Sequence, residues 1–291
     1  MTAGEGSPEA DRRYREWMRE LLDRAARRFR VTLDGPAVFG WRDRSLGAPV
    51  RAGEHPRWLR VVTEAPRWAD GLMWTGNLDA NDLEGLAKPR VLDVVEWRDN
   101  PARHVRAELM TQLAGTPCSP DPVAGPDLAL DEGWWSQLTG FLRDLSCAPT
   151  SRVNADQPRV DHRVDAAFGP GVTVAVDRWE TVHGDLHWAN LHREPFGVLD
   201  WEGWGRGPVG TDAATLYLYS LAAPNIAAAV HRHFSDVLDS PTGRTAQLFV
   251  TARLLYRATL GDHPQLITPL RARAHSLLVD SGKISPDTRF G

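Results

Sequence analysis

The hydrophobic pattern of this chain changes partway along its 291 residues. Between residues 31 and 116, short apolar runs such as AVFGW and RWLRVV are separated by Gly, Pro and Asp, which is typical of antiparallel strands joined by turns. After a loop-like stretch rich in Pro and Asp, apolar residues recur at every third or fourth position in several segments, which predicts helices. The pattern therefore indicates an α+β fold with two lobes, a small β-rich lobe followed by a larger, mainly helical one.

This pattern divides the chain into three parts. Residues 1–30 are predicted to form an amino-terminal helix, because Met18, Leu22 and Phe29 recur at helical spacing within a charged run. Residues 31–116 form the β-rich lobe, and residues 117–291 form the helical lobe. The Pro- and Asp-rich stretch that follows residue 116 suits a boundary between two compact regions.

The composition favours a small molecule as the partner. With 34 basic and 38 acidic side chains the formal net charge is −4, so no general positive field points to nucleic acid or to a membrane surface. No stretch is long and apolar enough for a membrane span, and the first residues do not resemble a secretion signal. Two cysteines, Cys118 and Cys147, are too few for a disulfide framework, so we expect a cytoplasmic protein.

The segment of residues 183–202, HGDLHWANLHREPFGVLDWE, concentrates side chains that suit phosphate chemistry. Asp185, Asn190 and Asp200 follow one another at separations of five and ten residues. A hairpin with its tip near Pro195 would pair positions whose numbers sum to 390, which sets Asn190 opposite Asp200. A carboxylate and an amide oxygen that converge in this way form a hard oxygen site of the kind that Mg²⁺ accepts. Asp185 then remains available to accept the proton of a substrate hydroxyl.

The motif HGDLHWANL followed by VLDWE resembles the catalytic loop and metal-binding segment of the aminoglycoside phosphotransferase and choline kinase family. The resemblance implies the two-lobed protein-kinase-like fold, with a small antiparallel lobe before a helical one. It also implies that Asp185 is the catalytic base and that Asn190 and Asp200 hold Mg²⁺. His183 would be a structural member of the loop that hydrogen-bonds backbone groups.

Four more residues of the second lobe are candidates for the site, and all but His187 are suggested by the same resemblance. Asp212, in the segment that opens the next helix, resembles the family's buried acid that holds the catalytic loop through backbone N–H groups. His187 either contributes to the acceptor site or braces the loop. Trp201 and Glu202 directly follow the predicted metal ligand and would border the acceptor, although an aromatic residue there also suits the core of the lobe.

The amino-terminal lobe matches the family less closely. The family places a lysine on the third strand to contact the nucleotide phosphates, whereas Arg60 occupies that position here and lysine occurs only at Lys88 and Lys283. An arginine on an edge strand exposed to solvent is the alternative interpretation of Arg60. The sequence leaves open which acid pairs with the phosphate-binding cation; the candidates are Glu64, Asp79, Asp82 and Glu84.

Two further segments are assigned to the nucleotide. The stretch Gly40–Gly47 would form a flap over the phosphates, with Arg44 and Ser45 as contacts. Thr111-Gln112-Leu113, after the strand VRAELM, resembles the family's hinge, whose backbone binds adenine, so Thr111 and Leu113 are the expected contacts there.

The favoured function is a small-molecule kinase, monomeric or homodimeric, that transfers the γ-phosphate of ATP or GTP with Mg²⁺. The acceptor is a hydroxyl of a small molecule, for which an antibiotic is one candidate. The excess of acidic side chains beyond residue 117 mildly favours a cationic or neutral acceptor. One alternative is a catalytically weak nucleotide-binding or regulatory protein, since the strand lysine is missing. Another is a metallohydrolase that uses His183, Asp185 and His187 as ligands.

Overall fold

A computed structural model describes residues 8–288, and these residues form two compact units. One unit runs to Asp82 and resumes over Pro89–Leu113; the other comprises Leu83–Lys88 and the chain from Ala114 onward. The division between Leu113 and Ala114 lies close to the predicted end of the first lobe at residue 116. Leu83–Lys88 groups with the second unit, although the sequence assigned it to the first.

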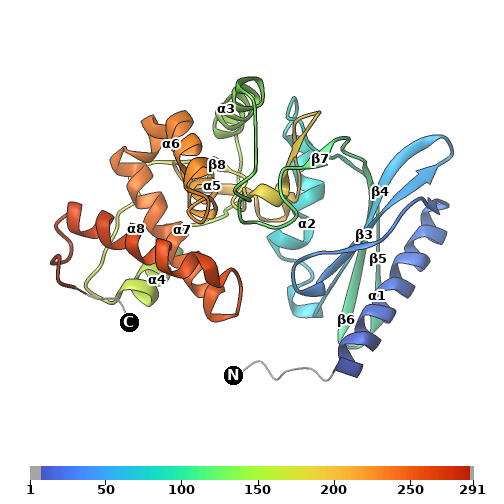
Figure 1. The fold of residues 1–291 in the computed structure, drawn as a ribbon. Coiled ribbons are helices and arrows are strands. Elements are labelled where there is room, and N and C mark those ends of the chain that lie inside the picture. The colour runs from blue at the N-terminus through green and yellow to red at the C-terminus, as the bar shows by residue number, and fades with distance from the viewer. Residues whose placement is uncertain (1–7, 289–291) are drawn as a thin grey trace. The chain divides into compact units, whose positions relative to one another are not determined.

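The first unit is built on an antiparallel sheet, which Figure 1 shows in blue to green. Its strands are β1 (Thr32–Leu33), β2 (Val38–Phe39), β3 (Ser45–Ala52), β4 (His55–Glu64), β5 (Val91–Asn100) and β6 (Arg103–Thr111). The strand order is β1-β3-β4-β6-β5, and β2 also pairs with β3. This sheet confirms the expected β-rich amino-terminal lobe.

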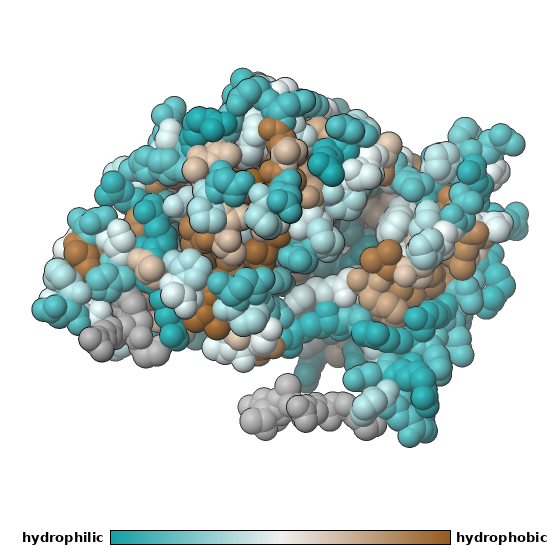
Figure 2. Space-filling model, in the orientation of Figure 1, coloured by the Kyte–Doolittle hydropathy of each residue, from teal (hydrophilic) through white to brown (hydrophobic). Residues whose placement is uncertain are grey.

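Helix α1 (Pro8–Phe29) packs on one face of this sheet and belongs to the first unit (Figure 1). Glu9 in its first turn and Arg28 in its last complement the helix dipole. Its apolar face, including Met18, joins Leu59 and other sheet residues in one core cluster. Figure 2 shows hydrophilic side chains over the first turns of the helix, at the lower right. Residues 1–7 of the predicted amino-terminal helix lie outside the described residues.

The opposite face of the sheet carries charged side chains. Leu59 and Val61 on β4 face α1, and side chains alternate along a strand, so Arg60 faces the other way. The register places Arg60 directly opposite Glu108 on β6. A short helix, α2 (Leu72–Asp79), contributes Asn77 to the same group of side chains. The strand pairing thus brings a cation and an acid together on one face.

The second unit is mainly helical, as the sequence predicted. Its helices are α3 (Glu132–Cys147), α4 (Gln157–Phe168), α5 (Thr211–Tyr219), α6 (Pro224–Leu238), α7 (Pro241–Thr259) and α8 (Ile267–Asp280). Side-chain caps begin several of them: Asp131 accepts the N–H of Trp134 at the start of α3, and Ser240 accepts that of Gly243 at the start of α7. Helix α7 packs against α4, α5 and α8 (Figure 1).

Short strands and single turns complete the two units. The strands are β7 (Thr116–Pro117), β8 (Trp179–Val182), β9 (Leu191–Arg193), β10 (Gly197–Val198) and β11 (Gly205–Pro208). The 3₁₀ turns are η1 (Trp41–Asp43), η2 (Pro66–Trp68), η3 (Ala80–Asp82), η4 (Trp188–Asn190), η5 (Trp201–Gly203) and η6 (Pro264–Leu266). Strands β8 and β11 pair with each other, and β9 pairs with both β7 and β10.

The hairpin of β9 and β10 forms, but the predicted register is wrong by one residue. Leu191 pairs with Val198, so paired positions sum to 389 rather than 390. The turn is centred between Glu194 and Pro195 instead of on Pro195. Asn190 therefore lies opposite Leu199, whose N–H donates to the Asn190 carbonyl over 2.8 Å. Asp200 follows one residue later.

Among the described residues, no helix has both the length and the apolar character needed to cross a membrane.

The two cysteines differ in accessibility and should differ in reactivity. Cys118 is buried, and burial raises the pKa of its thiol to about 12, whereas Cys147 is exposed. Because the thiolate is the nucleophile, a raised pKa leaves Cys118 protonated and unreactive at about pH 8. We expect iodoacetamide to label Cys147 alone in the folded protein and both cysteines after denaturation, as read by peptide mass spectrometry. A Cys147→Ser variant that is still labelled when folded would contradict this expectation.

Candidate active site

The loop that follows β8 is shaped by a glycine. Gly184 has a φ of +81°, and a side chain there would collide with the Asn154 amide. Asn154 itself donates to the Gly203 carbonyl over 2.7 Å, which holds its amide in place next to Gly184. The tight spacing explains why the sequence has glycine between His183 and Asp185.

Asp212 anchors the loop from the first turn of α5. Its carboxylate accepts the backbone N–H of His183 over 2.7 Å and that of Gly184 over 2.9 Å. Burial raises the pKa of this carboxyl, and the two N–H groups act in the opposite direction. These are the contacts that the resemblance implies for Asp212.

His183 uses both ring nitrogens for the backbone. Its Nδ1 accepts the N–H of Asp185 over 3.3 Å, so Nε2 carries the proton and donates to the Leu199 carbonyl, 2.8 Å away. No ring nitrogen is left for a metal. Within residues 8–288, no cluster of three or more His, Cys, Asp or Glu side chains is arranged to hold one. This geometry does not support the metallohydrolase hypothesis.

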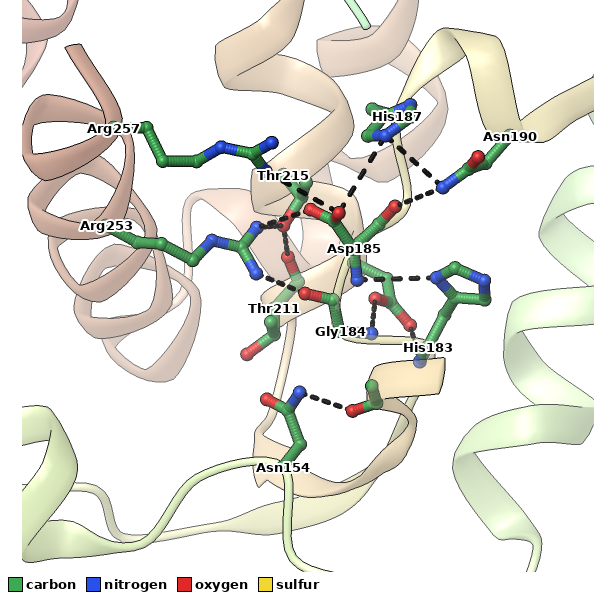
Figure 3. Close-up of polar contacts among 12 residues, drawn as sticks. Asn154, His183, Gly184, Asp185, His187, Asn190, Thr211, Thr215, Arg253 and Arg257 are labelled. Carbon is green, nitrogen blue, oxygen red and sulfur yellow. Dashed lines mark hydrogen bonds and ion pairs between the residues drawn. The ribbon is translucent and has the colours of Figure 1, made fainter. Parts of the chain in front are cut away.

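Asp185 projects from the loop toward three basic side chains, as Figure 3 shows. Its Oδ1 lies 3.7 Å from Nη2 of Arg253, and its Oδ2 lies 3.6 Å from Nη1 of Arg257 and 3.8 Å from Nε2 of His187. The side chain remains 34% exposed, so a substrate can reach it.

The charge of Asp185 follows from these neighbours. Burial raises the pKa of its carboxyl, but His187, Arg253 and Arg257 together outweigh burial and lower it. Burial also lowers the pKa of His187, whereas guanidinium groups stay charged. The two arginines therefore keep the pKa of Asp185 low even when His187 is neutral. The Asp185 carboxylate is ionised at neutral pH.

Asn190 and Asp200 are the two residues that the sequence predicts as ligands of a divalent cation. The Asn190 amide nitrogen donates to the Asp185 carbonyl over 3.0 Å and lies 3.3 Å from Nε2 of His187. Its oxygen points away from these groups (Figure 3). Asp200 has a left-handed backbone (φ 62°) and an exposed side chain that does not cap the turn after it. A carboxylate and an amide oxygen are ligands that Mg²⁺ accepts.

The three predicted acceptor residues are all buried. His187 has its ring 5.5 Å from that of Tyr219 and shares the environment of Asp185. The Trp201 ring meets that of His183 in an edge-to-face contact, and its indole N–H donates to the Val198 carbonyl over 3.0 Å. Trp201 therefore packs in the core. The Glu202 carbonyl accepts from Arg152 over 3.1 Å. Of the three, His187 lies beside the candidate base.

In the first unit, Arg60 forms an ion pair with Glu108. The two groups lie 3.3 Å apart, and Glu108 is only 1% exposed. Glu108 also accepts from Asn77 over 2.9 Å and from Arg106 over 2.8 Å. An acid from strand β6 therefore lies beside Arg60, and Glu108 is not among the four candidates that the sequence suggested. The edge-strand interpretation of Arg60 is also wrong, since β4 lies between β3 and β6.

The remaining predicted nucleotide contacts lie in a hairpin and at a strand end. Arg44 follows η1 and lies 3.6 Å from Glu64, and Ser45 is the first residue of β3. Thr111 ends β6; its N–H donates to the Arg90 carbonyl over 2.9 Å, and its hydroxyl accepts the Arg90 N–H over 2.8 Å. These Thr111 groups are used within the first unit, which leaves Leu113 as the remaining hinge contact to test.

Comparison with known proteins finds similarity to solved structures, but no match to a family model or to a curated protein. Among solved structures, aminoglycoside phosphotransferase APH(4)-Ia is similar with a TM-score of 0.61 and 14% identity, over 91% of this chain and 98% of that chain. Amicoumacin kinase hAmiN is similar with a TM-score of 0.55 and 14% identity, over 98% of each chain.

The chain has the aminoglycoside phosphotransferase fold. The expected two-lobed, protein-kinase-like architecture is thereby confirmed. APH(4)-Ia has been solved as a ternary complex with ADP and hygromycin B, and hAmiN as a complex with AMP-PNP, Ca²⁺ and Ami.

Sequence reasoning missed two residues that this phosphotransferase fold brings to Asp185. Arg253 and Arg257 come from α7, about seventy positions beyond the catalytic loop. Their spacing of four residues places them on one face of a helix, which is the only local signal they carry. In a chain with many arginines, that spacing does not distinguish them.

Proposed function

We propose that this protein is a small-molecule kinase that transfers the γ-phosphoryl group of ATP or GTP to a hydroxyl of its acceptor. The observation that carries the proposal is the ionised, accessible carboxylate of Asp185 on a loop anchored by Asp212. The phosphotransferase fold supports it, because the similar structures include enzymes solved with nucleotides and antibiotics. The cytoplasm, where nucleotide triphosphates are made and used, is the expected location.

The chemistry requires one proton acceptor. As the acceptor oxygen bonds to the γ-phosphorus, the hydroxyl proton passes to Asp185, and the bond from phosphorus to the β,γ-bridging oxygen breaks. The nucleoside diphosphate leaves with that electron pair. Because the transition state is loose, orientation of the hydroxyl by Asp185 matters more than strong basicity.

Asn190 and Asp200 would hold Mg²⁺, which when bound neutralises charge on the phosphate oxygens. Their own contribution is an amide oxygen, on a side chain held by the Asp185 carbonyl, and an exposed carboxylate that caps no turn. The presence of Asp185 and both oxygen ligands argues against the catalytically weak alternative, since a protein without phosphoryl transfer has no chemical need for this set.

The acceptor belongs to the class of hydroxylated small molecules, with antibiotics as the first group to test. A screen that measures nucleotide consumption against antibiotics and hydroxylated metabolites, in parallel with Asp185→Asn, tests the proposal directly. Mass spectrometry must then find the phosphorylated acceptor with the wild-type protein alone. Equal consumption by both proteins would show that a contaminant or another site is responsible.

Arg60 is proposed to contact the nucleotide phosphates, paired with Glu108. We expect Arg60→Ala to weaken Mg-nucleotide binding by about tenfold, because a charge-assisted hydrogen bond contributes about 1.5 kcal/mol. Isothermal titration calorimetry with a non-hydrolysable nucleotide measures the change. Arg51→Ala, which removes an exposed arginine from β3, is the matched control. Unchanged affinity of Arg60→Ala would place the phosphate cation elsewhere.

A further inference from the structure

Helix α7 directs two guanidinium groups at the candidate base. Arg253 and Arg257 contact different oxygens of the Asp185 carboxylate, at 3.7 Å and 3.6 Å (Figure 3). A rotation of the carboxylate about its last side-chain bond would break both contacts at once. The pair therefore restricts the carboxylate to one orientation.

Arg253 is itself held at several points. One nitrogen donates to the Gly184 carbonyl, and another donates to the Thr215 hydroxyl on α5 over 3.1 Å. Its side chain is only 13% exposed. Arg253 thus ties α7 to α5 and to the backbone directly before Asp185.

Arg257 is held by a partner outside the catalytic loop. Its Nε donates to Asp262 over 3.2 Å, beyond the end of α7, while its Nη1 faces Asp185. This Asp262 contact lies beyond the catalytic loop, so we expect a substitution of Arg257 to disturb the loop less than a substitution of Arg253, which bonds the Gly184 carbonyl.

We propose that Arg253 and Arg257 are positioning residues, which hold the Asp185 carboxylate in the orientation that receives the acceptor hydroxyl. The proposal rests on the proposed kinase function and extends it to two residues outside the sequence motif. The arginines stay protonated throughout: the proton moves from the hydroxyl to Asp185, and the guanidiniums only fix where it arrives. Such preorganisation can be large, because a small misplacement of a reacting group costs about a hundredfold in rate.

A kinetic double-mutant cycle tests the proposal. We expect Arg257→Met to lower kcat for phosphoryl transfer by about ten- to a hundredfold, with the KM for Mg-nucleotide changed by less than about twofold. Arg257→Lys should recover part of the loss. Arg253→Met should show a larger loss, since it also releases Gly184. Arg244→Met removes an exposed arginine from the same helix and should leave kcat unchanged.

The decisive comparison is made in the Asp185→Asn background. If the arginines act through the carboxylate, Arg257→Met should cost less than about twofold in kcat once that carboxylate is gone. An equal fold-loss in both backgrounds, or a loss of nucleotide affinity instead of kcat, would overturn the proposal.

A measurement of stability, which needs no acceptor substrate, tests this inference separately from the proposed function. Urea unfolding of the wild-type protein, Asp185→Asn, Arg257→Met and the double variant should give non-additive midpoints, because the two side chains contact each other. Additive midpoints would count against the arginine contact even in an active enzyme. If the midpoints are non-additive but the protein phosphorylates no acceptor, the arginine contact is supported. The kinase function is then contradicted.

Discussion

Asp185→Asn is expected to lower the rate of phosphoryl transfer by about 10²- to 10⁴-fold, which is the range for loss of a general base. The substitution keeps the shape of the side chain but removes the proton acceptor. It also removes the negative charge that faces Arg253 and Arg257. Steady-state assays at saturating nucleotide, with the best acceptor from the screen, measure the effect on kcat.

Mg-nucleotide binding is the control for this experiment. Asn190 and Asp200, the proposed Mg²⁺ ligands, are untouched by the substitution, so the dissociation constant should change by less than about threefold. A parallel loss of nucleotide binding would mean that Asp185 holds the nucleotide or its metal. In that case a different group must accept the proton.

Asp212→Ala is expected to reduce both stability and rate. The substitution leaves the N–H groups of His183 and Gly184 without their buried acceptor, which should lower the free energy of unfolding by about 2–5 kcal/mol. Since the same N–H groups position the catalytic loop, kcat should fall by at least about tenfold. Urea denaturation and steady-state kinetics measure the two effects.

The controls for Asp212 separate an acceptor role from general packing. Asp212→Asn retains the volume but can offer only one acceptor oxygen, so it should recover little of the stability. Asp236→Ala removes an exposed aspartate from α6 and should change the free energy of unfolding by less than about 0.5 kcal/mol. If Asp212→Asn behaves like the wild-type protein, the two N–H contacts do not account for the anchoring role.

The sequence was most informative where the relevant residues lie close together along the chain. The pattern from His183 to Asp200 spans one loop and one hairpin, so spacing alone placed Asn190 and Asp200 on the hairpin and Asp185 in the short loop before it. Even there, the hairpin register was wrong by one residue, because spacing does not define where a turn is centred. The two-lobed fold followed from a change in hydrophobic period that extends over whole segments.

Contacts between distant segments could not be predicted in this way. Glu108 lies beside Arg60 because β4 and β6 pair in a particular register, and nothing near either residue specifies that pairing. Arg253 and Arg257 reach Asp185 only through the packing of α7 against α5. In both cases the partner is one charged residue among many, and its role becomes visible only when the chain folds.

The position of Glu108 also determines how the Arg60 side chain is held. The Arg60–Glu108 pair joins two neighbouring strands, and the backbone ladder of one sheet sets its geometry. Asn77 on α2 donates to the same acid, so a helix contact adds to those made within the sheet. The proposed phosphate contact of Arg60 would therefore take its geometry from the pairing of β4 with β6.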